Sequence, residues 1–277
     1  MKTIVTHLSP DLDSITSTWL VKRFLHGWQE AKVEFVPAGS TLNDQLPDVN
    51  SDVIHVDTGL GQFDHHQTSA YTCASKLVFR YLSEQNYLKE KLIKPLERMV
   101  NFVNDIDHFG EAYFPEATAD RYDFSLYQIV EGLKSVISDQ LKLMEAVFPM
   151  LDAILHVLRN KVTAEEDLKN GFVFRSKFGK SLALDSKNEE ASKLALKSGF
   201  SLVVRKDPER GHVRIKTLPK KELDLTPVYK KLLHDDKKAT WFLHVSKNML
   251  LNSSSKNPHF IPSSLPLNRL IKIIKEV

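Results

Sequence analysis

The chain has 277 residues, of which 42% are hydrophobic and 26% charged, and its 38 Lys and Arg against 35 Asp and Glu leave a formal net charge of only +3. This is the composition of a globular protein of about two domains, and it excludes disordered, collagen-like and disulfide-stapled proteins. The small net charge hides two opposite parts. Residues 1–171 hold 16 basic and 25 acidic residues, for a net charge of −9, whereas residues 172–277 hold 22 and 10, for a net charge of +12.

The sequence indicates a cytoplasmic protein with no membrane segment. Cys73 is the one cysteine, so no internal disulfide can form. Asp11 and Asp13 stand where a secretory signal would need its apolar core. The richest apolar run, AVFPMLDAILHVL, is interrupted by Asp152 and falls short of the roughly 20 residues that a membrane helix needs.

The first third of the chain alternates strand-like and helix-like segments. β-branched runs and polar alternation predict strands, and apolar residues recurring at helical spacing predict helices. Strands alternating with helices favour a parallel α/β sheet. The predicted strands are 3–6, 33–35 and 52–57, and the predicted helices are 14–25, 74–82 and 92–103.

A long helical pattern at 123–159 follows, and Pro149 predicts a kink or the meeting of two helices. The polar stretch 163–171 closes the acidic part of the chain and is the candidate boundary, giving domains of 1–165 and 172–277. Phe172, Phe174, Phe178 and Phe200 could stack nucleobases, but their spacing fits buried strands better. The pattern predicts a smaller α/β domain with strands at 172–178, 181–186, 200–205, 212–217 and 240–245, and helices at 188–199, 227–233 and 267–277.

Four acidic and histidine clusters stand just after predicted strands or in loops. Ligands bind beyond the carboxyl ends of strands in open α/β sheets, so the first and second clusters should converge if the first and third strands are neighbours. Singly, each cluster is more typical of a helix cap, a turn or polar surface. Their joint occurrence in this order is what indicates a site. The clusters are His7, Asp11 and Asp13; Asp57; Asp64, His65 and His66; and Asp105 and Asp107.

Carboxylates with some imidazole are the ligands that Mn²⁺ or Mg²⁺ prefers, whereas structural zinc sites favour cysteine. Several carboxylates packed together without cations would be costly, because each raises the pKa of the next. Two metal ions about 4 Å apart would remove that cost and could clamp a phosphate group. The sequence therefore predicts a site with two Mn²⁺ or Mg²⁺ ions that serves phosphoryl chemistry.

In order and spacing, the clusters resemble the motifs of the DHH phosphoesterase superfamily. The run HLSPDLDS is similar to the first motif of family II inorganic pyrophosphatases and oligoribonucleases. The run VDTGLGQFDHHQ, with its short gap between Asp57 and Asp64, looks more like the melanocyte-proliferating-gene-type exonuclease family, and TWFLHVSKNMLLNSSSKNP loosely resembles that family's tail. The resemblance implies two α/β domains: an N-terminal parallel-sheet DHH phosphoesterase domain and a smaller C-terminal domain, with the active site in the cleft between them.

The same resemblance implies the roles of individual residues. One metal would be held by His7, Asp11 and Asp57, and the second by Asp13, Asp57, His65 and Asp107, so that Asp57 bridges the two ions. Asp105 competes with Asp107 for the last role. Asp64 would orient a histidine, and His66 would face the substrate as a phosphate contact or proton donor.

The second domain departs from the superfamily pattern. In place of a Gly-Gly-rich stretch ending in His it offers only ERGHV at 209–213, and the tail loop NSSSKNP lacks glycines. The candidate substrate contacts are His212, His244, Asn252 and Lys256.

These features predict a metal-dependent phosphodiesterase that hydrolyses RNA or short oligonucleotides, as an exonuclease, by water activated between two metals. The basic second domain would attract the phosphate backbone. Inorganic pyrophosphate and cyclic dinucleotides are alternative substrates, and a nucleic-acid-binding regulator built on the same fold is the alternative without catalysis. The oligomeric state, a homodimer included, stays open.

Overall fold

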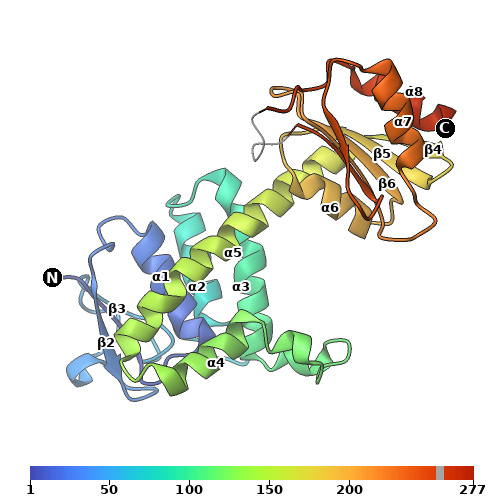
Figure 1. Ribbon diagram of the computed structural model, residues 1–277. Helices are drawn as coiled ribbons and strands as arrows, with labels where there is room; N and C mark the ends of the chain where they lie inside the picture. Colours follow the sequence, from blue (N-terminus) through green and yellow to red (C-terminus); the bar gives the residue numbers. More distant parts are fainter. Residues whose placement is uncertain (254–258) are drawn as a thin grey trace. The chain divides into compact units, whose positions relative to one another are not determined.

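The computed structural model describes residues 1–253 and 259–277 (Figure 1). The chain divides into two compact units, Met1–Arg159 and Asn160–Val277. The division falls inside one long helix, α5 (Gln140–Lys169), which contributes to both units. The polar stretch at 163–169, expected as a boundary, is therefore part of a helix, and Ala164 and Leu168 pack in a hydrophobic cluster of unit 2.

Unit 1 is built on a small parallel sheet, as the alternation of strands and helices predicted. Its strands are β1 (Thr3–His7), β2 (Lys32–Val36) and β3 (Val53–His55), in the order β2-β1-β3. β1 pairs in parallel with both neighbours, so the first and third strands do lie side by side. Their carboxyl ends, which lead to the first two clusters, therefore meet at one edge.

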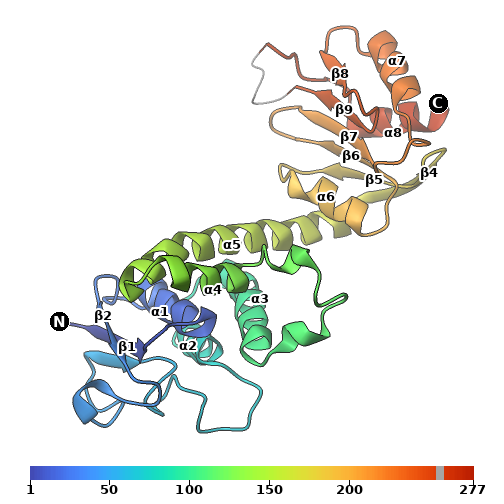
Figure 2. The same ribbon diagram turned by 60° about the horizontal axis from the view of Figure 1, so that its bottom comes forward.

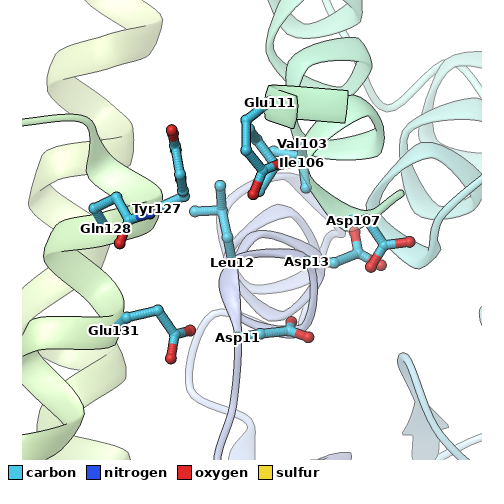
Figure 3. Close-up of a pocket in the computed structure, with 10 residues that line it drawn as sticks. All are labelled: Asp11, Leu12, Asp13, Val103, Ile106, Asp107, Glu111, Tyr127, Gln128 and Glu131. Carbon is cyan, nitrogen blue, oxygen red and sulfur yellow. The ribbon is translucent and has the colours of Figure 1, made fainter. Parts of the chain in front are cut away.

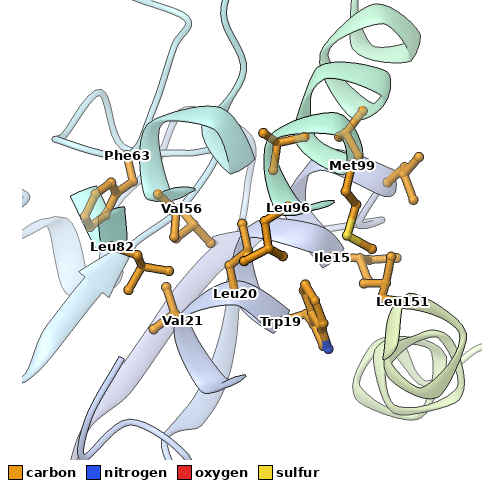
Figure 4. Packing of buried hydrophobic residues seen from close by; sticks show 14 of the residues in the cluster. Ile15, Trp19, Leu20, Val21, Val56, Phe63, Leu82, Leu96, Met99 and Leu151 are labelled. Atoms are coloured by element: carbon orange, nitrogen blue, oxygen red, sulfur yellow. The ribbon is translucent and has the colours of Figure 1, made fainter. Parts of the chain in front are cut away.

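Helices complete unit 1 and bury its core. α1, α2 and α3 pack against one another, and the start of α5 joins the same cluster through Met144, Val147 and Leu151. Figure 4 shows Trp19 and Ile15 of α1 facing Leu96 and Met99 of α3 across this core. The helices are α1 (Leu12–Phe24), α2 (Ala74–Glu84), α3 (Glu90–Asp107) and α4 (Leu126–Val136), besides α5.

Two helices do not meet at Pro149, because α5 runs through this residue. The two helices of this region meet instead at 137–139, between α4 and α5. A proline removes one helical hydrogen bond, and here Val147 and Leu151, fully buried on either side of it, hold the helix in place.

Unit 2 contains a mixed sheet of six strands in the order β4-β5-β6-β7-β9-β8. β5 and β6 are parallel, and the other neighbouring pairs are antiparallel. The strands are β4 (Phe172–Ser176), β5 (Gly179–Asp185), β6 (Leu202–Lys206), β7 (Val213–Thr217), β8 (Trp241–Leu243) and β9 (Met249–Asn252).

Helices cover both faces of this sheet (Figure 2). α7 (Thr226–Asp235) and α8 (Leu267–Glu276) pack on one face, against Leu202, Val204, Ile215 and Leu250. α6 (Glu190–Lys197) and the end of α5 pack on the other, against Leu182, Leu184 and Val203. In the part of the chain that the structure describes, no helix is long and apolar enough to cross a membrane.

Candidate metal centre

The end of β1 and the turn after β3 bring His7 and Asp57 together. His7 Nε2 lies 3.2 Å from Asp57 Oδ2 and 3.8 Å from Asp11 Oδ2. His7 Nδ1 lies 2.8 Å from the carbonyl oxygen of Leu8, so in the neutral ring the proton sits on Nδ1 and Nε2 carries the free lone pair. Asp11 also caps α1, because its Oδ1 accepts from Ser14 N. Capping leaves the other oxygen facing His7.

The backbone turn at Asp57 aims its carboxylate at the cluster. Asp57 adopts a φ of +57°, a left-handed conformation that Asp tolerates better than most residues. Gly59 follows with a φ of +82°, and a Cβ there would come within 2.9 Å of Thr41 Cγ2. The Asp-Thr-Gly sequence therefore makes a turn that both places the carboxylate and requires a glycine.

His65 forms the second centre of the cluster. Its Nε2 lies 3.3 Å from Asp57 Oδ1, 3.6 Å from Asp107 Oδ2 and 4.0 Å from Asp13 Oδ2. Asp57 thus faces His7 with one oxygen and His65 with the other, with its side chain 2% exposed. This is the arrangement expected of a bridging carboxylate.

Asp13 is held by a contact that the sequence did not reveal. Its two oxygens accept hydrogen bonds from the backbone amides of Ala74 and Ser75, at 2.7 and 2.9 Å. These amides open α2, so the carboxylate sits at the positive end of a helix. The contact fixes Asp13 beside His65 and joins α1 to α2.

Asp64 lies outside the cluster and holds the loop around it. The buried carboxylate accepts from Leu60 N, from His66 N and, at 2.7 Å, from His66 Nδ1. The His66 side chain is 59% exposed. Asp64 therefore orients His66 through Nδ1, and His66 stands at the surface of the site.

Asp107, and not Asp105, joins the cluster. The Asp105 carboxylate accepts a hydrogen bond from Tyr71 Oη at 2.9 Å, and the Tyr71 ring lies 4.4 Å from the ring of His108. Helix geometry turns residues two apart to different sides of α3, so only one of the two acids can face His65.

This pair offers a matched test of the cluster. We expect Asp107→Asn to weaken Mn²⁺ binding by about 10-fold or more, since even the loss of a group that supports a metal ligand costs 10- to 100-fold. Asp105→Asn makes the same chemical change two residues away and should leave the affinity near that of the wild type. Calorimetric titration of metal-free protein with Mn²⁺ measures both. Equal losses would contradict the assignment.

The charges of the cluster shift one another's pKa values. Burial would lower the pKa of His7, but the hydrogen bond to Asp57 and the charges of Asp11 and Asp57 raise it to about 9. Asp57 likewise raises the pKa of His65 to about 9, against the effect of burial. Burial raises the pKa of Asp13 and of Asp107. Burial acts the same way on Asp57, but His65 and His7 outweigh it and lower the pKa of this carboxyl.

The residues present fit divalent metal ions. In the described part of the chain, three groups have ligand atoms within 4.8 Å of one another: His7, Asp11 and Asp57; Asp13, His65 and Asp107; and Asp57, His65 and His66. Asp57 Oδ1 and His65 Nε2 are buried and have no hydrogen-bond partner within residues 1–253 and 259–277. Leaving buried polar atoms unpaired costs free energy unless another group binds to them. A cation between them would satisfy both atoms. The first group is the same as the ligand set expected for one ion. The second group contains the residues expected for the other ion except Asp57, which was expected in both sets.

Two cavities open onto the cluster. One, of about 410 Å³, is lined by His7, Asp11, Asp57, His66 and Asp107 together with Ala38 and Gly39. The other, of about 290 Å³, reaches from Asp11, Asp13 and Asp107 to Glu111, Gln128 and Glu131 (Figure 3). Sequence reasoning missed these last three residues, because they belong to no motif.

The expected substrate contacts of the second half lie in unit 2. His212 precedes β7, and His244 follows β8, with its Nδ1 2.9 Å from Ser246 Oγ. Asn252 does not fit the expectation: it is fully buried, its amide donates to the carbonyls of Thr240 and Ile261, and its oxygen accepts from Ser263 N. It is a structural residue of the β9 end. Lys256 lies outside the described residues.

Among solved structures, the chain is similar to a DHH domain described as a member of a family of ribosomal proteins. The match covers 99% of this chain and 86% of that one, at 12% sequence identity and a TM-score of 0.32. No curated protein matches the sequence.

A family model does match. It is that of the ChrB C-terminal domain, and it covers residues 4–158, which hold His7, Asp11, Asp57, His65 and Asp107 and end one residue before the end of unit 1. The likeness to DHH exonucleases, by comparison, rests on the motifs alone. Because the matched span exceeds half of the 277 residues, the chain belongs to the ChrB C-terminal domain family.

Proposed function

We propose that the protein is a metal-dependent phosphodiesterase that hydrolyses single-stranded RNA or short oligonucleotides from one end, with two Mn²⁺ or Mg²⁺ ions in the cluster of unit 1. The observation that carries the proposal is the position of Asp57. One buried carboxylate lies between two histidine-centred groups, with one oxygen toward each.

Each residue would have a definite task. His7, Asp11 and Asp57 would hold one ion, and Asp13, Asp57, His65 and Asp107 the other. Divalent ions held there lower the pKa of water and neutralise charge on a phosphate group. His66, positioned by Asp64, lines the cavity of about 410 Å³ and would contact the phosphate or protonate the leaving oxygen.

The acidic cluster also limits what can bind. A phosphate anion is repelled by four carboxylates at close range, so it can approach only when cations occupy the site. Pyrophosphate or a cyclic dinucleotide on the same site, and a regulator that binds nucleic acid without cleaving it, are the competing proposals.

A substrate panel tests the proposal. Purified protein with Mn²⁺ is offered a short oligoribonucleotide, single-stranded DNA of the same sequence, a cyclic dinucleotide and pyrophosphate, and the products are separated by chromatography. We expect mononucleotides to be released progressively from the oligoribonucleotide, with no products when EDTA replaces Mn²⁺.

Each outcome of the substrate panel leads to a different conclusion. Turnover of pyrophosphate alone would replace the proposal by a pyrophosphatase, and turnover of the cyclic dinucleotide alone by a cyclic-dinucleotide phosphodiesterase. Protein that binds Mn²⁺ and turns over no substrate of the panel would refute the phosphodiesterase.

A further inference from the structure

One face of the unit 2 sheet is covered over only part of its width. Leu182 and Leu184 of β5 and Val203 of β6 lie beneath α6 and the end of α5. The same face of the sheet continues onto the next strands. Val203 pairs with Lys216 of β7, and Lys216 pairs with Met249 of β9. β8 and β9 stand at the far edge of the sheet from β4 (Figure 2).

The outer part of this face carries two cations, two aliphatic side chains and an aromatic ring. Arg205, Arg214, Leu251 and Phe242 are successive partners across β6, β7, β9 and β8. Their neighbours along each strand, Val204, Ile215, Leu250 and Trp241, belong to the core beneath α7 and α8, so strand alternation turns the first set to the opposite face. Phe242 is 46% exposed, and Met249 and Leu251 are half-buried. We name Arg214, Lys216, Phe242, Met249 and Leu251 the open face.

Positive charge is in excess on the open face. Arg214 makes two contacts with the exposed Glu189, at 2.6 and 2.8 Å, and the buried Arg205 lies 3.9 Å from the same carboxylate. One carboxylate thus serves two guanidinium groups. Burial and the charges of Arg214, Lys193 and Arg205 lower the pKa of Lys216, and Glu189 acts in the other direction. The Nε atoms of Arg205 and Arg214 are buried and have no hydrogen-bond partner among the described residues.

A strand of nucleic acid suits this arrangement. Proteins bind single strands by placing cations along the phosphate backbone and aromatic rings under the bases. Here Arg214 and Phe242 lie in one row across adjacent strands, with Leu251 between them and about 5 Å from strand to strand, and Lys216 and Met249 form the next row along the strands. An apolar partner would leave Arg214 and Lys216 desolvated, whereas a polyanion would pair with them.

We propose that the open face binds single-stranded RNA, with a base stacked on Phe242 and the backbone phosphates at Arg214 and Lys216. The proposal deepens the phosphodiesterase function and rests on it for the identity of the strand as a substrate. It gives unit 2 the task of holding a part of the strand that is not being cleaved.

Binding of a fluorescein-labelled oligoribonucleotide to the full chain, followed by anisotropy in EDTA, tests the proposal without hydrolysis. Phe242→Ala should weaken binding about 10-fold, because the base loses the aromatic ring on which it stacks, and Phe242→Trp should restore it. Phe172→Ala is the matched control. Phe172 is 57% exposed on β4, at the opposite edge of the sheet, and lines a groove with Leu267 and Ile271 of α8. Its removal should leave binding unchanged.

The contribution of the cations is measured separately, from the salt dependence of binding. Lys216→Gln should lower the slope of log affinity against log salt concentration by about 1, as expected for one lost phosphate contact. Lys272→Gln, on an exposed lysine of α8, should leave the slope unchanged. Equal losses for Phe242→Ala and Phe172→Ala would overturn the proposal. So would a dimeric wild type that Phe242→Ala converts to monomers, since the face would then belong to a second copy.

The two proposals fail separately. Hydrolysis of the oligoribonucleotide with Mn²⁺ together with unchanged binding by Phe242→Ala would refute the open face and leave the enzyme standing. Weaker binding by Phe242→Ala in a protein that hydrolyses no phosphodiester would refute the enzyme and leave the binding face.

Discussion

Replacing Asp57 by asparagine is expected to abolish hydrolysis, with a loss of more than about 10³-fold in kcat/KM. The substitution keeps the shape of the side chain and removes the charge that faces both His7 and His65. Both ion sites are weakened at once, and each ion contributes several kcal/mol of charge stabilisation, with about 1.4 kcal/mol equal to a factor of ten. The measurements are steady-state kinetics on the oligoribonucleotide and the metal content of the purified variant.

The same strand provides a control. Asp52 is exposed and precedes β3, whereas Asp57 follows it, so Asp52→Asn makes the same chemical change at the other end of the strand. Asp52→Asn should retain both metal and activity. A folded Asp57→Asn protein that keeps two ions and most of its activity would show that the carboxylate does not bridge.

Without metal, the protein is expected to lose stability as the pH rises from 6.5 to 9. The folded pKa values of His7 and His65, about 9, lie above the ordinary value of 6.5. The folded chain therefore holds protons that the unfolded chain releases, and this stabilisation, complete below pH 6.5, disappears as the pH passes through 9. The raised pKa of Asp13 acts in the same direction, beginning above its ordinary 3.8. The lowered pKa of Asp57 acts oppositely and costs stability only when the pH falls below about 3.8.

Thermal unfolding in EDTA at pH 6.5 and pH 9 measures this effect. We expect a fall of at least about 1 kcal/mol, or roughly 2–4 °C in Tm for a protein of this size. Metal ions compete with the same protons, so stabilisation by Mn²⁺ under argon should grow over the interval in which the metal-free protein weakens. A metal-free Tm that rises toward pH 9 would contradict the assigned charges.

Local patterns were enough to predict most of the fold. The three parallel strands of unit 1 could be read from β-branched and alternating runs, because burial and chain geometry select such residues. β9 was missed, since the run MLLN is short and becomes a strand only through its partners β7 and β8. The meeting of two helices predicted at Pro149 was wrong for a related reason. The core residues that stabilise α5 around this proline come from distant parts of the chain, so the local sequence does not reveal them.

Some residues of the site could likewise be placed from the local sequence, and others could not. His7 and Asp57 could be placed together because carboxyl ends of neighbouring parallel strands meet. The contact of Asp13 with Ala74 spans 61 residues and depends on how α1 and α2 pack, so spacing alone could not predict it. In unit 2, Asn252 was expected at the substrate and is buried, whereas Phe242 was not among the candidate contacts and is exposed. The exposure of these two side chains depends on which face of the sheet the helices cover.

The hydrogen bonds from the start of α2 to Asp13 affect the order in which the chain folds and binds metal. In a zinc finger, the ion is needed for folding because metal binding itself supplies the folding free energy of the small domain. Here the amides of Ala74 and Ser75 offset part of the charge of Asp13, and protons on His7 and His65 offset that of Asp57. Helix terminus and protons thus serve as temporary counterions, and we infer that the chain folds first and takes up metal afterwards, exchanging protons for ions at a site already assembled.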